Sequence, residues 1–166
     1  MPKYETVTIV GVGLIGGSIG LALKQRRLAR EVVGVGRRES SLSAALDVGA
    51  IDRGTTDLGE GVSQAERIVI CAPVAAIAEL TSQAAAACPA NAIITDAGSS
   101  KSVIVAEVEA ALESGAGPQF VGSHPLAGDH RTGAAHAQAD LLSGRVVVVT
   151  PTPATAHLAL LEVAAF

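Results

Sequence analysis

The feature that most constrains the fold is a glycine pattern near the N-terminus, Gly11-Val12-Gly13-Leu14-Ile15-Gly16, of the form G-x-G-x-x-G. It follows an apolar run and opens a stretch whose apolar residues recur at helical spacing, which predicts a turn between a strand and a helix. In such a unit Gly11 permits the tight turn, Gly13 lets the backbone approach a pyrophosphate, and Gly16 allows the helix to pack closely on the strand. The helix N-terminus attracts the anion. A merely flexible glycine turn is the alternative, and the flanking strand and helix favour dinucleotide binding over it.

The rest of the chain repeats this alternation of strand and helix. Short runs rich in Val and Ile predict buried parallel strands, at Val7 to Val10, Val32 to Val35, Arg67 to Cys71, Ala92 to Thr95, Phe120 to Gly122 and Val146 to Thr150. Helical spacing predicts helices between them, at Leu14 to Arg26, Ser41 to Val48, Val74 to Ala87, Ser102 to Ser114 and Ala154 to Ala165. The pattern predicts an α/β fold with a doubly wound parallel sheet, a Rossmann-type NAD(P)-binding domain over residues 1–166. Ligands of such sheets bind at the carboxyl ends of the strands.

Composition excludes several other classes of protein. The chain has 166 residues, 49% of them hydrophobic and 17% charged, which fits one domain with a core and not a disordered chain. Its net charge of -4 offers no overall attraction to nucleic acid or to an anionic membrane. The uncharged stretch from Thr6 to Leu23 is long enough to span a membrane, but its glycines argue against that. Cys71 and Cys88 lack C-x-x-C spacing, so we expect no disulfide or metal site and a reducing, cytoplasmic location.

The end of the second predicted strand bears on the choice of nucleotide. An NAD site usually has an acidic residue there, whereas this chain reads Gly36-Arg37-Arg38. Two guanidinium groups suit a 2′-phosphate, so we predict NADP as the preferred cofactor, with NAD as the alternative. In that alternative the arginines are solvated and Glu39 substitutes for the acid. The cofactor-side candidates follow the first three strands predicted above: Gly11, Gly13, Leu14, Ile15, Gly16, Gly36, Arg37, Arg38, Ala72 and Pro73.

Two further motifs follow the next predicted strands. In Asp96-Ala97-Gly98-Ser99-Ser100-Lys101, Ser99 either projects toward a ligand while Ser100 caps the next helix, or both hydroxyls simply cap it. In Gly122-Ser123-His124-Pro125-Leu126-Ala127-Gly128, the imidazole of His124 suits a general base on a loop at the ligand-binding edge, unless local backbone satisfies it. His136 and His157 have helical, alanine-rich surroundings, and no histidine has metal-ligand spacing.

Together these motifs resemble the prephenate and arogenate dehydrogenase family of tyrosine biosynthesis. The resemblance rests on residues 10–23, which extend the glycine loop, on Gly49-Ala50-Ile51-Asp52, on Ala72-Pro73-Val74, and on the two motifs that contain Ser99 and His124. It implies an NAD(P)-dependent oxidative decarboxylation in which His124 accepts a hydrogen bond and then the proton from the ring hydroxyl of the substrate. It also implies that Ser99 orients substrate and cofactor, and it places Lys101 at the last position of its motif.

The chain departs from this family in two places. Prephenate-type members often have an acidic residue shortly after the H-P-x-A-G motif, whereas this chain has His130 there, which makes His130 a further substrate-side candidate. The family also continues into a helical domain that supplies the dimer contact and the second wall of the substrate site. This chain stops at Phe166 without a helix stop signal, so we expect it to bind cofactor with little or no turnover, and the complete enzyme to be a homodimer.

Two other readings remain open at the level of sequence. One is another NADP-dependent dehydrogenase of the hydroxyacid type, which usually relies on a lysine beyond the first domain. The other is a non-catalytic NADP-sensing module that would contact a partner through the apolar last helix, with Leu158, Leu161 and Phe166. The residues that distinguish prephenate from arogenate are expected to lie outside this chain.

Overall fold

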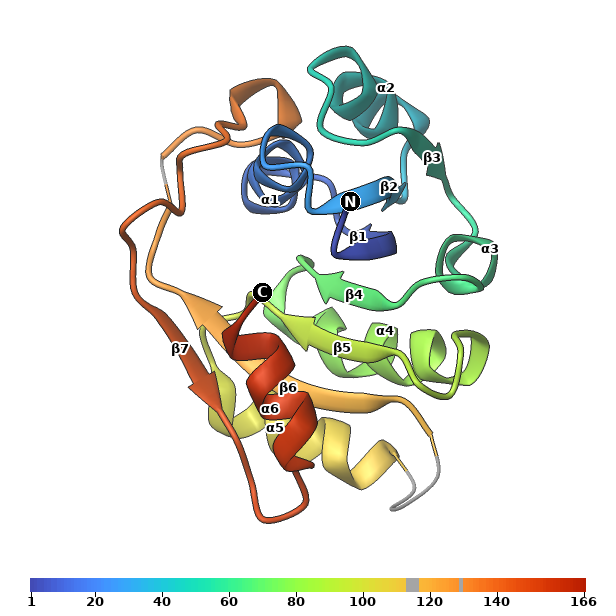
Figure 1. Cartoon of the computed structure of the whole chain (residues 1–166), viewed down its shortest axis with the longest axis vertical. Helices are drawn as coiled ribbons and strands as arrows, with labels where there is room; N and C mark the ends of the chain where they lie inside the picture. The colour runs from blue at the N-terminus through green and yellow to red at the C-terminus, as the bar shows by residue number, and fades with distance from the viewer. Residues whose placement is uncertain (113–116, 129) are drawn as a thin grey trace.

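The computed structural model describes residues 1–112, 117–128 and 130–166, which form a seven-stranded sheet covered by helices on both faces (Figure 1). The strands are β1 (Tyr4–Val10), β2 (Ala29–Val35), β3 (Arg53–Thr55), β4 (Arg67–Ile70), β5 (Ile93–Asp96), β6 (Gln119–Pro125) and β7 (Val147–Thr150). The helices are α1 (Leu14–Gln25), α2 (Glu39–Asp47), α3 (Leu58–Val62), α4 (Val74–Ala87), α5 (Lys101–Ala111), the 3-10 helix η1 (Ala134–His136) and α6 (His157–Ala164). The strand order β3-β2-β1-β4-β5-β6-β7 confirms the predicted doubly wound fold. In the described part of the chain no helix is both long and apolar enough to cross a membrane.

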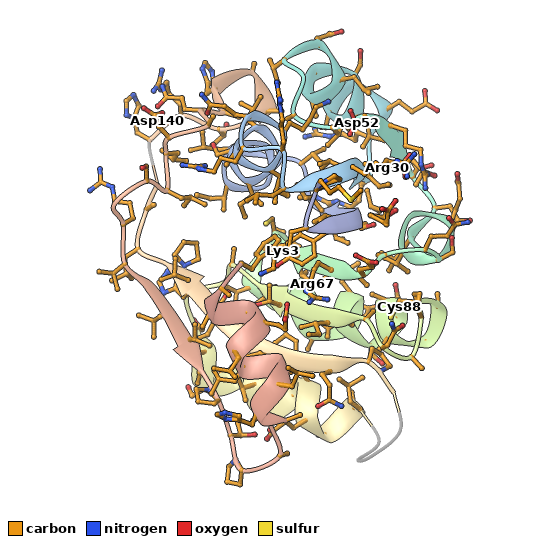
Figure 2. The ribbon with its side chains drawn as sticks, in the orientation of Figure 1. Lys3, Arg30, Asp52, Arg67, Cys88 and Asp140 are labelled. Carbon is orange, nitrogen blue, oxygen red and sulfur yellow. The ribbon has the colours of Figure 1, made fainter. Side chains whose placement is uncertain are left out.

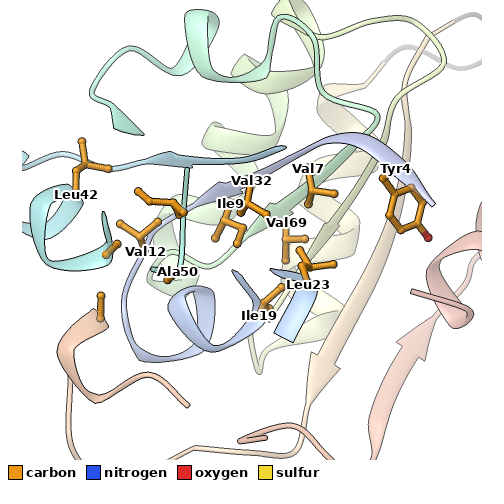
Figure 3. Close-up of a cluster of buried hydrophobic side chains, with 13 residues drawn as sticks. Tyr4, Val7, Ile9, Val12, Ile19, Leu23, Val32, Leu42, Ala50 and Val69 are labelled. Carbon is orange, nitrogen blue, oxygen red and sulfur yellow. The ribbon is translucent and has the colours of Figure 1, made fainter. Parts of the chain in front are cut away.

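One face of the sheet is covered by α1, α2 and α6, and η1 packs against α1 and α2. Figure 3 shows the core beneath α1 and α2, where Ile19 and Leu23 of α1 pack against Val7, Ile9 and other strand residues. Tyr4 closes one end of this core, and its ring lies 5.6 Å from that of Phe166. Lys3 and Arg67 lie close together in Figure 2, with Lys3 Nζ 5.0 Å and Arg67 Cζ 4.9 Å from the Tyr4 ring centre. These contacts hold the end of the chain beside β1 and β4.

The opposite face is covered by α3, α4 and α5. Their buried side chains pack against residues of β1, β2, β4 and β5 in a second cluster: Val10, Val35, Val62, Ala65, Ile68, Ile70, Ile77, Ala84, Ile94, Ile104 and Val108. Because successive side chains of a strand point to opposite faces and both faces are covered, the inner strands consist of continuous apolar runs. This is why short Val- and Ile-rich runs located these strands in the sequence.

The last strand differs from its prediction. The run from Val146 to Thr150 was expected to form a buried parallel strand, but β7 pairs antiparallel with β6, with His124 opposite Val148. The described residues of the connection from β6 to β7 contain no α-helix to return the chain to the other end of the sheet, so β7 runs in the opposite direction. As an edge strand it is only partly covered, and Val146, Val147 and Val148 are exposed. An apolar run alone cannot distinguish these two arrangements.

Other differences concern short elements and boundaries. The sequence prediction missed β3, α3 and η1, which have three to five residues each and are too short to show a period. The predicted helix from Ser102 to Ser114 is α5, which begins at Lys101, and its last predicted residues lie outside the described ones. The predicted helix from Ala154 to Ala165 is α6, which begins at His157, three residues later than predicted.

Candidate active site at the carboxyl edge of the sheet

The predicted motifs lie at one edge of the sheet, where the parallel strands end in register. Val10 pairs with Val35 on one side and with Ile70 on the other, and Ile70 pairs with Asp96. Backbone hydrogen bonds then link the turns that follow these strands. The amide of Gly11 donates to Val35 O at 2.8 Å, that of Cys71 to Val10 O at 2.7 Å, and that of Ala97 to Ile70 O at 3.1 Å. Hydrogen bonds within the chain therefore fix each turn to its neighbour without a ligand.

The glycine loop has the backbone geometry that its sequence predicts. Gly11 has φ +98°, and a Cβ there would lie 2.3 Å from the carbonyl oxygen of Cys71. A Cβ on Gly16 would lie 2.2 Å from Gly11 O and 2.9 Å from Ile9 Cγ2, so helix α1 can approach β1 only because this residue has no side chain. A Cβ on Gly13 would meet nothing within 4 Å. The loop therefore presents an open backbone surface beside Gly13, directly before α1.

The first turn of α1 is suited to an anion. Its N-cap residue is Gly13, which has no side chain to occupy the free amide groups, and the first turn contains no acidic residue. Leu14 and Ile15 begin the helix and are half-buried, and Ile15 packs against the core. Free helical N–H groups and the helix dipole favour a phosphate at this position. The open space at Gly13 and the uncapped helix fit the pyrophosphate of a dinucleotide.

Gly36, Arg37 and Arg38 lie beside this loop, because β2 neighbours β1. The amide of Gly36 donates to Thr55 O of β3 at 3.2 Å, and Arg38 is the N-cap residue of α2. Both arginine side chains are exposed, and no ion pair joins either of them to a carboxylate of the described residues. Glu39 is also exposed. Two uncompensated guanidinium groups therefore stand at the strand end where the ribose of a dinucleotide binds in this fold.

Ala72 and Pro73 form the turn after β4, between the glycine loop and the turn after β5. Pro73 precedes α4 with φ -56°, which suits the start of a helix. Cys71 lies at the start of this turn, and burial raises the pKa of its thiol to about 12, with the charge of Asp96 adding to the effect. Cys71 and Cys88 are both free thiols. A thiol with so high a pKa stays protonated near neutral pH and is a poor nucleophile.

Asp96 connects the turn after β5 to strand β6. Its fully buried carboxylate accepts hydrogen bonds from the backbone amides of Gly98, at 2.9 Å, and Ser123, at 3.1 Å, and forms an ion pair with Lys101. The hydroxyl of Ser123 donates in return to the backbone oxygen of Asp96 at 2.6 Å. One carboxylate therefore holds the residue before Ser99 and the residue before His124.

The two catalytic candidates are held by this network. Ser99 is exposed in the turn after β5. Ser100 is the N-cap residue of α5, but its hydroxyl makes no capping hydrogen bond, so the predicted cap is wrong. His124 was expected on a loop but lies within β6, partly buried, because β7 pairs with this part of the strand and extends it. A residue in a paired strand has a more fixed backbone than one in a loop.

Two other predicted residues have different surroundings. The ammonium group of Lys101 is bound to Asp96, and only 11% of its side chain is exposed, so its charge is already neutralised in the structure. His130 is exposed on the connection from β6 to β7, next to residue 129, which lies outside the described residues. The role of Asp96 was not predicted, although an acidic residue at the end of a buried strand, five positions before a lysine, is a signal that the sequence contains.

Comparison with known proteins agrees with this geometry. Residues 19–166 match the family described as the nucleotide-binding domain of prephenate dehydrogenase. The chain belongs to the prephenate dehydrogenase family. The predicted resemblance is therefore confirmed.

Individual family members show how much of their length this domain represents. The prephenate dehydrogenase of Bacillus subtilis is 34% identical over 148 residues, which are 89% of this chain but 39% of the relative. A crystal structure of the Aquifex aeolicus prephenate dehydrogenase with hydroxyphenyl propionate and NAD+ is 30% identical, with a TM-score of 0.88 over 97% of this chain and 55% of that one. The Synechocystis arogenate dehydrogenase is 28% identical, with a TM-score of 0.86 over 96% of this chain and 55% of that one. The chain thus spans between about two fifths and just over half of these family members.

Proposed function

We propose that this chain is the nucleotide-binding part of a dehydrogenase that oxidises and decarboxylates prephenate or arogenate. The observation that carries the proposal is the single edge of the sheet at which the open glycine loop, Ser99 and His124 meet, with Asp96 fixing the last two. Family membership and the relatives named for these two substrates support the same reaction.

In the proposed reaction the substrate loses a hydride from its hydroxyl-bearing ring carbon and a proton from that hydroxyl. The bound nicotinamide supplies the hydride acceptor. His124 accepts the hydroxyl proton, and Ser99 holds the substrate by a hydrogen bond. The resulting ring ketone is conjugated with the carbon that bears the carboxylate, so the C–C bond breaks, CO2 leaves, and the electron pair goes to the ring oxygen, which takes up a proton. The product is a phenol, and its aromaticity makes the step effectively irreversible.

For the cofactor we propose NADP+ in preference to NAD+. Exposed Arg37 and Arg38 carry two positive charges that no described carboxylate neutralises, and guanidinium groups form charge-assisted hydrogen bonds with phosphate. The Aquifex aeolicus relative binds NAD+, so the two nucleotides have to be compared directly.

We also propose that a helical domain completes the substrate site and that the complete enzyme is a homodimer of the reducing cytoplasm. A cavity of about 420 Å³ lies on the face of α1 and α6 and reaches from Phe166 to Asp96 and Ser123. Its lining is mostly apolar, and Leu158 and Leu161 of α6 are exposed. Such surfaces are typical of contacts with another domain. Without the second wall the substrate is poorly positioned, so the isolated chain should bind nucleotide with little turnover.

The proposed reaction can be tested in a chimera in which residues 1–166 replace the corresponding domain of the Bacillus subtilis relative. We expect prephenate- or arogenate-dependent reduction of NADP+, followed at 340 nm, a general assay wavelength. His124→Asn should lower kcat by a factor of about 10² to 10⁴ and leave nucleotide affinity unchanged. The matched control is His157→Asn, since His157 is an exposed histidine at the start of α6. Equal rates for the two variants would show that His124 takes no part in the reaction. A chimera that binds nucleotide but oxidises neither substrate would contradict the proposed function.

A further inference from the structure

The glycine loop is followed by Gly17 and Ser18, which nucleotide binding at residues 11–16 does not explain. Both are buried in α1, and Ser18 is 1% exposed. They contact residues 133–138, part of the connection between β6 and β7. Figure 1 shows this connection, in orange, passing beside α1. The connection begins just after His124 and Pro125, so the helix that carries the nucleotide loop also supports the segment that follows the proposed catalytic histidine.

The contact at Gly17 depends on the absence of a side chain. A Cβ on Gly17 would lie 2.9 Å from the Cβ of Ala137 and 3.6 Å from the Cα and Cβ of Ala134. Ala134 is 3% exposed and belongs to the same core cluster as Ile19 and Leu23. Two alanines therefore fit against a glycine, and the spacing leaves no room for a methyl group at position 17.

The contact at Ser18 is a hydrogen bond between distant parts of the chain. The backbone amide of Gln138 donates to Ser18 Oγ at 3.0 Å, across 120 residues of sequence. Most of the surrounding side chains are exposed, including those of Ala135, His136 and Gln138. Ala134, Ala137 and this amide therefore attach residues 133–138 to α1, while η1 also contacts α2. Gly133, with φ +89°, allows the chain to turn into the attachment.

We infer that Gly17 and Ser18 are positioning residues that hold residues 133–138 on α1, so that nucleotide bound at the N-terminus of α1 also orders the segment that follows His124. The inference rests on the proposed function for the nucleotide itself. A ligand that stabilises the first turns of α1 also stabilises a segment packed on those turns when loosening of the turns and release of the segment occur together. The serine supplies an acceptor for an otherwise unsatisfied amide, and the glycine sets the distance.

Backbone hydrogen exchange of the whole chain, with and without saturating NADP+, tests this inference. In the wild-type chain, NADP+ should slow exchange of amides 133–138 at least threefold. Ser18→Ala removes the acceptor of the Gln138 amide, and Gly17→Ala pushes Ala137 away. Each variant should speed exchange of this segment at least tenfold without nucleotide and abolish the effect of NADP+. Because coupling is reciprocal, its nucleotide affinity should fall by no more than the factor by which NADP+ slows exchange in the wild type.

Two further variants separate this role from a general loss of stability. Thr8→Val removes another buried hydroxyl, that of Thr8 on β1, which donates to Gly61 O at 2.7 Å. This variant should leave exchange of residues 133–138 unchanged. The double variant Gly17→Ala with Ala137→Gly exchanges the positions of the methyl group and the hydrogen, so it should restore protection to within threefold of wild type.

Two results would overturn the inference. The first is that neither Ser18→Ala nor Gly17→Ala changes the exchange rates of residues 133–138. The second is that the wild-type chain binds NADP+ without any slowing of exchange at these residues. Failure of the proposed function gives a different result. In that case the chimera oxidises neither prephenate nor arogenate, while the exchange pattern of the chain is as expected. If calorimetry detects no nucleotide binding, the link to nucleotide is overturned together with the cofactor proposal.

Discussion

The carboxylate of Asp96 accepts a hydrogen bond from the backbone amide of Ser123 at 3.1 Å, although 27 residues separate them. The same carboxylate binds the amide of Gly98 and the ammonium group of Lys101. It therefore fixes the ends of β5 and β6 relative to each other, and with them Ser99 and His124. Positions of this kind matter because small displacements of reacting groups lower rates strongly.

Asp96→Asn should destabilise the domain by about 3 kcal/mol, because it leaves the Lys101 ammonium largely buried without its counter-charge. Urea unfolding of the chain measures this free energy. Glu5→Gln is the matched control, since Glu5 pairs with Arg30 at 3.1 Å with both side chains largely exposed, and we expect a cost within about 0.5 kcal/mol. Equal costs for the two variants would contradict the role given to Asp96.

Gly13→Ala should weaken nucleotide binding and leave stability unchanged, whereas Gly16→Ala should lower stability. A methyl group at Gly13 meets no atom of the chain, so this variant should unfold within about 0.5 kcal/mol of wild type but bind nucleotide at least tenfold more weakly, about 1.4 kcal/mol. A methyl group at Gly16 meets Gly11 O and Ile9, so this variant should lose about 2 kcal/mol of stability. Urea unfolding and calorimetric titration measure both quantities. Unchanged nucleotide affinity in Gly13→Ala would place the pyrophosphate elsewhere.

Arg37 and Arg38 should make the chain bind NADP+ at least tenfold more tightly than NAD+, a difference of about 1.4 kcal/mol. Replacing both with Gln should remove this preference by weakening NADP+ binding alone, and added salt should reduce it in the wild type. Calorimetric titration with each nucleotide measures the preference. Arg145→Gln is the control, because Arg145 is also exposed but lies on the β6–β7 connection. If NAD+ binds as tightly as NADP+, the two arginines are ordinary surface charges.

The raised pKa of Cys71 predicts how stability changes in alkali. The folded chain keeps this thiol protonated up to about pH 12, whereas the unfolded chain releases the proton near the ordinary pKa of 9.0. The folded state thus binds more protons between these values, and its free energy of unfolding falls as pH rises from about 9 toward 12. The contribution of Cys71 is at most about 1.4 kcal/mol per pH unit.

Urea unfolding between pH 7 and pH 10.5 measures this effect, with Cys71→Ala as the comparison. The variant lacks the thiol, so its stability should fall less steeply above pH 9 than that of the wild type. Parallel pH profiles for the two proteins would show that the thiol ionises equally well in the folded chain.

Much of the site could be predicted from sequence because its signals are local. Gly11 follows β1 and Gly16 lies in the first turn of α1, two elements of clear periodicity. The residues at the ends of β2, β4, β5 and β6 lie at one edge because parallel strands end on the same side. The role of Asp96 could not be predicted in this way. Its partners include Ser123, and nothing in the residues between them indicates that β6 would lie beside β5 with Ser123 opposite the carboxylate.

The sequence by itself determined the glycine loop, the apolar strands and the family, since each depends on residues a few positions apart or on a continuous motif. Only the tertiary structure decided that β7 runs antiparallel, that His124 lies within a paired strand, and that Gln138 binds Ser18 across 120 residues. These features depend on where the long connection from β6 to β7, which contains the short helix η1, returns to the sheet. Its path is set by packing and hydrogen bonds with distant residues, and local periodicity carries no information about them.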